Sequence, residues 1–236
     1  MTNTRLPSVC GQSLSSLMES VGVHFGNRNE AEQDVVILVS ENVRESTKQQ
    51  FRDIGCILKE IKKVHARTVF VLPNNKNIVM AAQQCVGLTE KNVIVIPTAS
   101  IPQGISALMA VDPDAEDAQE IEQAMNEAAK LVSTAQITYA ARNSDFDGFD
   151  IHEGDYLALL DGKLLGTDRD VACLLEDLSD EAASRGAEFI TLFYGEDVSE
   201  EDAQKAREVF SLKCPDAEIS LIRGGQPVYY YIISIE

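Results

Sequence analysis

Residues 68–82 read TVFVLPNNKNIVMAA, and residues 92–104 read NVIVIPTASIPQG. Each stretch opens with a short apolar run that is rich in β-branched residues and ends at a proline, Pro73 or Pro97, which is typical of a buried strand. The elements that we expect are a strand over 68–72, a helix over 76–86, a strand over 92–96 and a short helix that begins near Gln103. This order of strand, helix, strand and helix predicts a parallel sheet with crossover helices.

Weaker apolar patterns predict further elements on both sides of this centre. Before residue 67 they indicate a helix over 12–21, a polar connection over 25–33, a strand over 35–39 and a polar helix over 44–64. After residue 104 they indicate helices over 116–134, 169–185 and 200–212, and strands over 136–142, 155–160, 163–166, 188–194, 217–223 and 228–235.

Local signals predict where several of these elements begin and end. Asp161-Gly162 is the dipeptide that a tight type I′ turn requires, so it predicts a hairpin. We expect Asp168 to cap the helix that follows and Gly186 to stand just after the end of that helix. Ser199, with an acidic residue three positions later, resembles the start of a capping box.

The pattern changes near residue 135, which predicts a division into two lobes. The first lobe, residues 1–135, contains the parallel sheet with crossover helices and a poorly defined segment over 24–57. The second lobe, residues 136–236, combines a hairpin, two helices and further strands, so we expect a mixed sheet. The predicted fold class is α/β in two lobes.

Composition and charge exclude several classes of partner. The chain has 236 residues, of which 44% are hydrophobic and 25% charged, as in ordinary globular proteins. Its 20 basic and 38 acidic residues give a net charge of −18, which repels phosphate backbones and anionic lipid heads. We therefore expect no nucleic acid partner and no membrane insertion, whereas a basic protein partner would be attracted.

The cysteines and the apolar runs indicate a cytoplasmic protein. The five cysteines are widely spaced, odd in number and form no CxxC pair, which favours reduced thiols: Cys10, Cys56, Cys85, Cys173 and Cys214. No apolar run approaches the 18 residues or so that a membrane span needs. The first ten residues lack the apolar centre of a signal peptide.

Polar side chains follow both strands of the opening stretches, at the point where each strand ends. Ligands of open α/β sheets bind beyond the carboxyl ends of the strands, where helix starts offer free N–H donors. If the two strands are neighbours, both clusters open on one edge and form a ligand- or partner-binding site. The candidate residues are Asn74, Asn75, Lys76, Asn77, Thr98, Ser100, Gln103 and Gly104. The alternative is that Asn74 and Ser100 only cap helices.

Two polar turns of the second lobe form another candidate for ligand or partner binding. One turn follows a predicted strand and the other joins two predicted strands; their residues are Gly195, Glu196, Asp197, Gly224, Gly225 and Gln226. Glycine lets a backbone approach another molecule closely or adopt a positive φ. The alternative is ordinary turn chemistry.

No pattern indicates catalysis or a metal site. His24, His65 and His152 are isolated and lack the spacing of zinc ligands. The acidic residues of 145–155 do not have the glycine position of a calcium loop, so we expect a solvated acidic loop. The sequence has no GxxxxGK[ST], no GxGxxG after a strand and no GxSxG. We predict no catalytic residue, no metal and no cofactor bound by this chain.

Five motifs in order resemble one known family. They are residues 69–82, residues 96–104, Tyr194-Gly195-Glu196-Asp197-Val198-Ser199, Gly224-Gly225-Gln226-Pro227 and the ending Tyr231-Ile232-Ile233-Ser234-Ile235-Glu236. Together they are similar to the carboxy-terminal region of bacterial fatty acid kinase catalytic subunits, which are dihydroxyacetone-kinase-like proteins. The likeness covers about residues 58–236, with a fainter echo over 11–23.

The resemblance implies a docking role without catalysis. In this family an amino-terminal domain binds ATP and magnesium, and the carboxy-terminal region resembles the substrate lobe of dihydroxyacetone kinase in outline. That region is thought to engage a fatty-acid-binding protein of the DegV type, which presents the acyl carboxylate for phosphorylation. The resemblance thus implies that this chain docks that partner, while its own or a separate kinase domain makes the acyl phosphate.

Two other functions stay open at this point. The chain can be a small-molecule or phosphate-binding lobe that completes a dihydroxyacetone-kinase-like active site, which predicts stabilisation by the ligand. It can also be a dimerisation module, which predicts a homodimer in solution. An independent enzyme is less favoured, because no nucleophile, metal or nucleotide motif is visible in the sequence.

Overall fold

A computed structural model describes residues 33–39, 47–64, 66–112, 115, 117–146 and 148–236 of the chain. The described residues divide into two compact units, of which the first ends at Leu131 and the second comprises Val132–Glu236. The helix expected over 12–21 and most of the connection expected over 25–33 lie outside the described residues. Among the described residues, no helix combines the length and the hydrophobicity that crossing a membrane requires.

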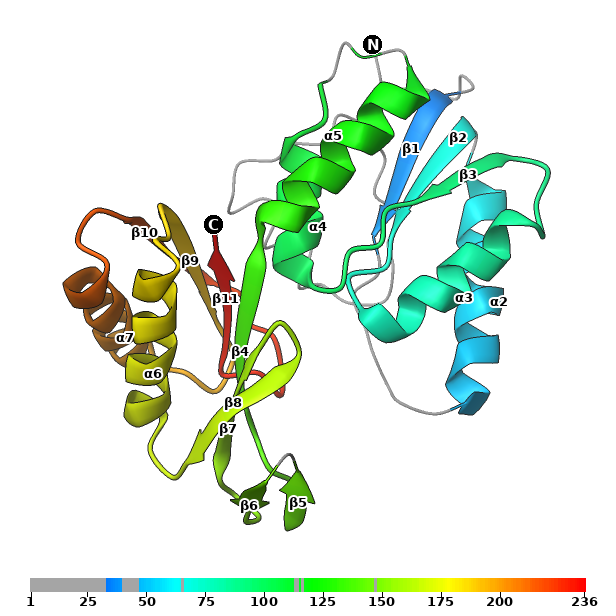
Figure 1. The fold of residues 1–236 in the computed structure, drawn as a ribbon. Coiled ribbons are helices and arrows are strands. Elements are labelled where there is room, and N and C mark those ends of the chain that lie inside the picture. Colours follow the sequence, from blue (N-terminus) through cyan, green and yellow to red (C-terminus); the bar gives the residue numbers. More distant parts are fainter. Residues whose placement is uncertain (1–32, 40–46, 65, 113–114, 116, 147) are drawn as a thin grey trace. The chain divides into compact units, whose positions relative to one another are not determined.

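The first unit is a three-stranded parallel sheet with helices on both faces (Figure 1). Its described elements are β1 (Gln33–Val39), α2 (Thr47–Lys63), β2 (Ala66–Leu72), α3 (Lys76–Val86), β3 (Asn92–Val95), α4 (Ile101–Met109) and α5 (Ala118–Leu131). The central strand β2 pairs in parallel with β1 and with β3. This is the parallel pairing with intervening helices that the two apolar runs predict.

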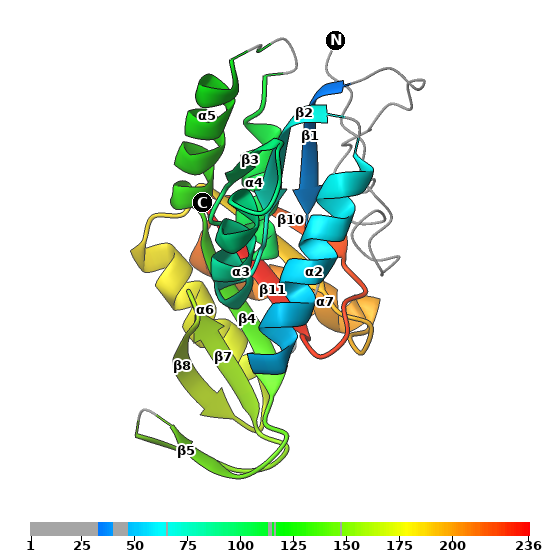
Figure 2. The ribbon, with the colours of Figure 1, turned by 90° about the vertical axis from the view of Figure 1, so that its right-hand side faces the viewer.

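Side-chain alternation along β2 explains why its sequence is apolar without a break. Val69 and Val71 pack with Ile61 of α2 and Cys85 of α3, the two helices that Figure 2 shows in front of the sheet. Phe70, between the two valines, points to the opposite face and is fully buried. Figure 1 shows α4 and α5 on that face. A strand covered on both faces needs apolar residues at successive positions.

The second unit contains a six-stranded mixed sheet with two helices on one face. Its described elements are β4 (Ser133–Tyr139), β5 (Ser144–Phe146), β6 (Phe149–Ile151), β7 (Tyr156–Leu160), β8 (Lys163–Asp168), α6 (Val171–Ser184), β9 (Phe189–Tyr194), α7 (Glu200–Lys213), β10 (Glu218–Arg223) and β11 (Tyr231–Ile235). The strand order is β10-β9-β11-β4-β7-β8, in which β10 and β9 are parallel and the other pairs antiparallel. The mixed α/β class and the mixed sheet are confirmed.

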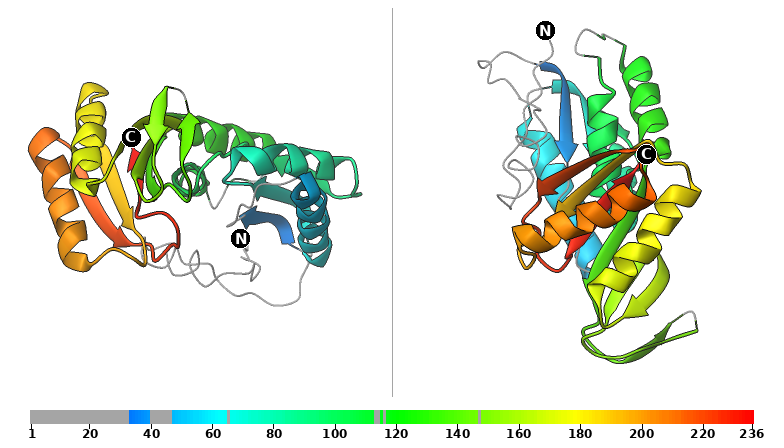
Figure 3. Two further views of the ribbon diagram at one scale, coloured as in Figure 1. Left: turned by 90° about the horizontal axis from the view of Figure 1, so that it is seen from below. Right: turned by 90° about the vertical axis from the view of Figure 1, so that its left-hand side faces the viewer.

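The core of the second unit lies between this sheet and its helices. Leu174 and Leu178 of α6 and Phe210 of α7 are all buried and belong to one cluster with Leu192 and Ile233 of the central strands. Figure 3 shows α6 and α7 side by side over the sheet. The apolar face predicted for residues 169–185 is the face that packs here.

Two predicted boundaries around residue 135 are wrong by a few positions. The helix expected over 116–134 ends at Leu131, and β4 begins at Ser133 rather than at residue 136. The reason is Thr134, whose N–H donates to Asp161 Oδ1 at 2.9 Å and whose carbonyl accepts from the Asp161 N–H at 2.9 Å. These bonds draw the last residues of the predicted helix into the sheet. The boundary between the two compact units falls between residues 131 and 132.

The predicted hairpin is confirmed, but one of the predicted caps is wrong. Asp161 and Gly162 have φ values of 50° and 76°, as a type I′ turn requires. Asp168 is the last residue of β8 and does not cap α6; the cap is Asp170, whose side chain accepts from the backbone of the first turn. Gly186, with φ 66°, follows α6 as expected.

The last predicted strand is shorter than expected. β11 begins at Tyr231 rather than at residue 228. Val228 has a φ of 72°, which no strand residue adopts, so residues 228–230 continue the turn after Pro227.

Candidate functional site

The first candidate site lies where β2 and β3 end. Because the two strands are parallel neighbours, residues 74–77 and 98–104 meet at one edge of the sheet. The backbone N–H of Asn74 donates to Thr98 Oγ1 at 3.0 Å, and Thr98 is fully buried. We call residues 74–77 and 98–104 the amide corner. The structure therefore brings together the two polar clusters that the sequence placed on a common edge.

Two residues of the amide corner cap helices. Ser100 caps α4 and accepts from the N–H of Gln103, as the alternative interpretation expected. Asn75 caps α3, and its Oδ1 accepts from the N–H of Asn77 at 2.8 Å, so the cap expected at Asn74 is one residue later. Gln103 Oε1 in turn accepts from the Ala99 N–H at 2.7 Å. The corner is thus held by side chains that satisfy helix starts.

Asn74 fills the interior of the amide corner. It has a φ of 54°, which asparagine tolerates, and it is 8% exposed. A Cβ at Gly104 would lie 2.2 Å from Asn74 Oδ1, so the glycine is what makes room for the amide. Asn74 Oδ1 has no hydrogen-bond partner among the described residues. Buried oxygens of this kind are rare, because desolvation without a bond costs free energy.

The surface of the amide corner belongs to other residues. Lys76, Asn77 and Ala99 are exposed, while Asn75 and Gln103 are half-buried. The interior is occupied by the protein's own side chains, so the exposed residues offer a contact surface. The corner can therefore present amide and ammonium groups to a macromolecule at its rim.

We expect Thr98→Val to destabilise the first unit by about 2 kcal/mol, because the shape is kept while the buried N–H of Asn74 loses its acceptor. The matched control is Thr191→Val on β9, which is expected to change the free energy of unfolding by less than about 0.5 kcal/mol. Urea unfolding followed by far-ultraviolet circular dichroism measures both. An unchanged midpoint for Thr98→Val would show that the bond to Asn74 contributes little.

The second candidate site is a packed junction of two turns, which we call the glycine corner (residues 195–197 and 224–227). The N–H groups of Gly224 and Gly225 donate to the Tyr194 carbonyl at 3.0 and 3.1 Å, and the Glu196 N–H donates to the Gln226 carbonyl at 3.1 Å. The turns therefore hold each other through their backbones.

Glycine is needed at one position of this corner for internal packing. A Cβ at Gly195 would lie 2.3 Å from the backbone carbonyl oxygen of Tyr229. A Cβ at Gly224 would lie 2.0 Å from Gln226 Oε1, so there the Gln226 side chain would have to move. Packing within the chain thus explains why glycines stand in these two turns, which is what the alternative of ordinary turn chemistry predicted. The exposed residues of the corner are Glu196, Asp197 and Pro227, of which the two carboxylates can meet a charged partner. The two corners belong to different units.

The acidic stretch expected to be a solvated loop forms a hairpin. β5 pairs antiparallel with β6, with Asp145 opposite Asp150. Asp155, after this hairpin, is only 7% exposed. Its carbonyl accepts from the Ala140 N–H at 2.8 Å, so it ties the hairpin back to the end of β4. The prediction of a solvated loop is wrong at Asp155, because its chain neighbours gave no sign of burial.

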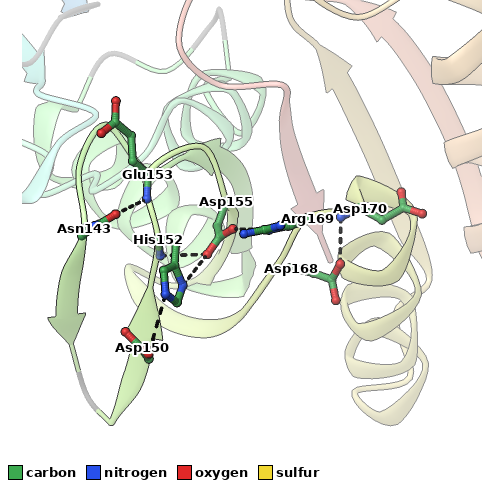
Figure 4. Close-up of polar contacts among 8 residues, drawn as sticks. All are labelled: Asn143, Asp150, His152, Glu153, Asp155, Asp168, Arg169 and Asp170. Atoms are coloured by element: carbon green, nitrogen blue, oxygen red, sulfur yellow. Dashed lines mark hydrogen bonds and ion pairs between the residues drawn. The ribbon is translucent and has the colours of Figure 1, made fainter.

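A small polar network surrounds the Asp155 carboxylate (Figure 4). Asp155 Oδ2 accepts from the His152 N–H at 2.8 Å and lies 3.5 Å from His152 Nδ1, and its Oδ1 lies 3.4 Å from Arg169 Nε. The backbone bond from His152, and then the Arg169 side chain, hold the pKa of Asp155 below its ordinary value of 3.8. The carboxylate is therefore charged at neutral pH and holds the network together.

Both ring nitrogens of His152 face carboxylates. Nδ1 lies 3.5 Å from Asp155 Oδ2, and Nε2 lies 3.8 Å from Asp150 Oδ2. Among the residues that the structure describes, no three His, Cys, Asp or Glu side chains are arranged to hold a metal ion. Burial raises the pKa of the Cys85 thiol to about 11, which makes it a poor nucleophile.

Comparison with known families and relatives gives a consistent result. The family model for the C-terminal region of FakA-like fatty acid kinase proteins matches residues 20–236. Protein YloV of Bacillus subtilis is 35% identical over 226 residues, which cover 96% of this chain and 38% of that protein. An uncharacterized protein of Staphylococcus aureus strain USA300 is 33% identical over 180 residues, which cover 76% of this chain and 33% of that protein. The chain thus spans less than two fifths of the length of these relatives.

Solved structures similar to the chain include a DegV family protein and a fatty acid kinase B3 protein. A DegV family protein of Corynebacterium glutamicum has a TM-score of 0.61 at 14% identity, covering 100% of this chain and 98% of that one. The Fak B3 protein of Streptococcus pneumoniae, solved with linoleic acid, has a TM-score of 0.58 at 14% identity. The match covers 78% of this chain and 75% of that one. At such identities the likeness concerns the fold alone.

The fold found is thus DegV-like, and the finer expectation of a dihydroxyacetone kinase substrate lobe stays a prediction. The sequence resemblance, in contrast, is confirmed, because the matched model covers nearly the whole chain. This chain belongs to the family of C-terminal regions of FakA-like fatty acid kinase proteins.

Proposed function

We propose that the chain is the docking module of a fatty acid kinase, which holds a DegV-type fatty-acid-binding protein while a separate domain carries out the chemistry. The observation that carries the proposal is the family match over residues 20–236. Proteins of the DegV type fit the partner role, because the Bacillus subtilis DegV protein is a fatty acid binding protein.

The reaction assigned to the whole kinase is the transfer of a phosphoryl group. A carboxylate oxygen of the bound fatty acid forms a bond to the γ-phosphorus of ATP, the bond to the β,γ-bridging oxygen breaks, and ADP leaves with that electron pair. The proposal places ATP and magnesium on a domain other than the described residues, so the residues of this chain act by positioning the partner. Such positioning can supply a large part of a rate enhancement.

Two surfaces of the chain suit this role. The exposed Lys76 and Asn77 of the amide corner offer an ammonium and an amide, and the exposed Glu196 and Asp197 of the glycine corner offer carboxylates. Because the chain's own side chains and backbone fill the interior of each corner, we assign both surfaces to contact with a protein. The net charge of −18 and the carboxylates of the glycine corner favour a basic face opposite that corner, whereas Lys76 favours an acidic group opposite the amide corner.

Direct binding tests the proposal. The full chain is titrated, by isothermal titration calorimetry, against a DegV-type fatty-acid-binding protein of the same organism loaded with oleic acid. We expect a dissociation constant below about 10 µM, which corresponds to about −7 kcal/mol. No heat of binding at tens of micromolar, with the chain folded by circular dichroism, overturns the docking role.

A charge-reversing substitution tests whether the amide corner itself contacts the partner or whether only the net charge of the chain affects binding. Lys76→Glu is expected to weaken binding about fivefold or more if the corner contacts the partner, since a rim charge meets a complementary one. The charge-matched control is Lys163→Glu at the exposed end of the β7–β8 hairpin. Equal affinities for both variants would place the contact elsewhere on the chain.

Two simple measurements test the other two functions, a small-molecule-binding lobe and a dimerisation module. A thermal shift panel of polyols, phosphates and acyl phosphates tests a small-molecule lobe, because a ligand at 100 times its dissociation constant adds about 2.7 kcal/mol of stability. Light scattering tests a dimerisation module. A shift in the panel, together with no binding of the DegV-type protein, would favour the small-molecule lobe.

A further inference from the structure

Three tyrosines meet at one end of the six-stranded sheet. Tyr139 ends β4, Tyr156 begins β7 and Tyr230 directly precedes β11. The ring centroid of Tyr230 lies 5.1 Å from that of Tyr156 and 6.5 Å from that of Tyr139, with interplanar angles of 90° and 87°. Tyr230 therefore packs edge-to-face between two rings. Tyr139 is 44% exposed and the other two are half-buried, so part of this aromatic cluster is surface.

The turn beside these rings is held in an unfavourable conformation. Val228 is β-branched, yet its φ is 72°, and it is 52% exposed. Its carbonyl accepts from Thr138 Oγ1 at 3.1 Å, and the turn is also held by Gln226, whose Nε2 donates to the Phe193 carbonyl at 3.0 Å. Strained residues of this kind persist where the surroundings impose them, and they gather at sites that bind other molecules.

The turn that carries Asp197 is bonded to the backbone of this aromatic cluster. The Gly195 N–H donates to the Tyr230 carbonyl at 2.9 Å, and Asp197 follows two residues later in the chain. The side chains of Glu196 and Asp197 are both exposed. Burial first, then Tyr156 and the charge of Asp197 raise the pKa of Tyr230. The field of the Asp197 carboxylate thus reaches the aromatic cluster.

We propose that Tyr139, Tyr156, Tyr230, Val228 and Asp197 form a receptor for an arginine side chain of a protein partner. We call these five residues the tyrosine patch. On the proposed function, on which this assignment rests, that partner is the DegV-type protein. The guanidinium stacks on the exposed ring of Tyr139 and pairs with the Asp197 carboxylate.

The chemistry of the patch favours arginine over other occupants. A guanidinium is planar and weakly hydrated, so it can stack on an aromatic ring and donate to a carboxylate at its edge at the same time. Arginine and tyrosine are both enriched in the central contacts of protein interfaces. The turn is already fixed before binding, so little ordering has to accompany the contact.

Binding to the DegV-type protein loaded with oleic acid, measured as above, tests the patch. We expect Tyr139→Ala to weaken binding at least tenfold and Asp197→Asn about fivefold. The control is Phe189→Ala, because Phe189 is an aromatic residue with 53% exposure at the opposite end of the sheet, where β9 begins. This control is expected to stay within twofold. Thermal melts confirm that each variant is folded.

A second arm uses the peptide acetyl-Gly-Arg-Arg-Gly-amide at millimolar concentration, with citrulline in place of both arginines as control. The readout is the ring signals of Tyr139 and Tyr230 in nuclear magnetic resonance spectra of the full chain. We expect the arginine peptide to shift both signals saturably, the citrulline peptide to shift neither, and Asp197→Asn to reduce the effect.

The outcomes separate the patch from the docking role. If the chain binds the DegV-type protein but Tyr139→Ala and Phe189→Ala bind equally well, the patch is overturned and the docking role stands. If the chain does not bind that protein but the arginine peptide shifts the two tyrosine signals, the docking role fails and the arginine receptor stands. If neither probe binds, both proposals are overturned.

Discussion

Replacing Gly195 by alanine is expected to lower the free energy of unfolding of the second unit by about 3 kcal/mol. A Cβ at this position would lie 2.3 Å from the carbonyl oxygen of Tyr229 and 2.8 Å from that of Gln226. Both oxygens belong to the backbone of a turn that is held by hydrogen bonds to β9 and β4, so neither can rotate away as the end of a side chain would. The glycine corner has to move as a whole.

The tyrosines make this effect measurable in one unit alone. All six tyrosines of the chain lie within residues 139–231 and the chain has no tryptophan, so tyrosine emission during urea unfolding reports the second unit. The control is Gly166→Ala on β8, where a Cβ would lie 3.6 Å from Leu174 Cδ2, an ordinary contact distance. We expect that control to stay within about 0.5 kcal/mol. Equal midpoints for the two variants would contradict the close packing at Gly195.

Loosening the glycine corner also has a functional consequence. The corner carries the exposed Glu196 and Asp197, its Gly195 N–H donates to the Tyr230 carbonyl, and Val228 follows directly after it. Gly195→Ala should therefore weaken binding of the DegV-type protein even at temperatures at which the variant remains folded. On the proposed docking role, stability and docking are linked here, because the same backbone contacts hold the exposed side chains in place.

The sequence predicts best those elements whose hydrophobic pattern repeats clearly and whose conformation depends on residues that are close together in the chain. The helix over 76–86 and the hairpin at Asp161-Gly162 match the structure to the residue or nearly so, because helical spacing and turn chemistry are properties of neighbouring residues. The β5–β6 hairpin has no counterpart among the predicted elements, because its strands are three residues long and acidic. Strands that short have no measurable alternation.

The sequence predicts that the two segments of the amide corner meet at one edge of the sheet. It does not predict which side chain fills the interior of the corner. Parallel pairing of two adjacent apolar strands places their carboxyl ends side by side, so the meeting of residues 74 and 98 follows from the order of elements. The burial of Asn74 depends on Gly104, a residue from a different helix that leaves space for the amide. Propensity scales do not contain such a contact, and the cap is therefore Asn75 rather than Asn74.

The burial of Asp155, a charged residue, could not be predicted from the sequence either. Its burial is compensated by the His152 backbone N–H and by Arg169, which stands 14 positions later at the end of another hairpin. A sequence shows the five acidic residues between positions 145 and 155 but not which of them has these partners. Only the fold of β4 to β8 brings the partners together.

Replacing Phe210 by alanine is expected to have the largest effect on stability, a loss of about 4 kcal/mol from the second unit. Phe210 lies on α7, is fully buried and belongs to the cluster that joins both helices to the sheet. Alanine removes the ring and leaves a cavity in the cluster that joins α7 to the sheet.

Leu212 provides the matched control for Phe210, since it lies on the same helix two residues later and is 82% exposed. Leu212→Ala is expected to change the free energy of unfolding by less than about 0.5 kcal/mol by tyrosine emission in urea. A loss below about 1 kcal/mol for Phe210→Ala, at an unchanged dependence on urea, would mean that α7 is not anchored to the sheet by this ring. The proposed docking surface of the second unit would then be mobile, because α7 begins three residues after Asp197.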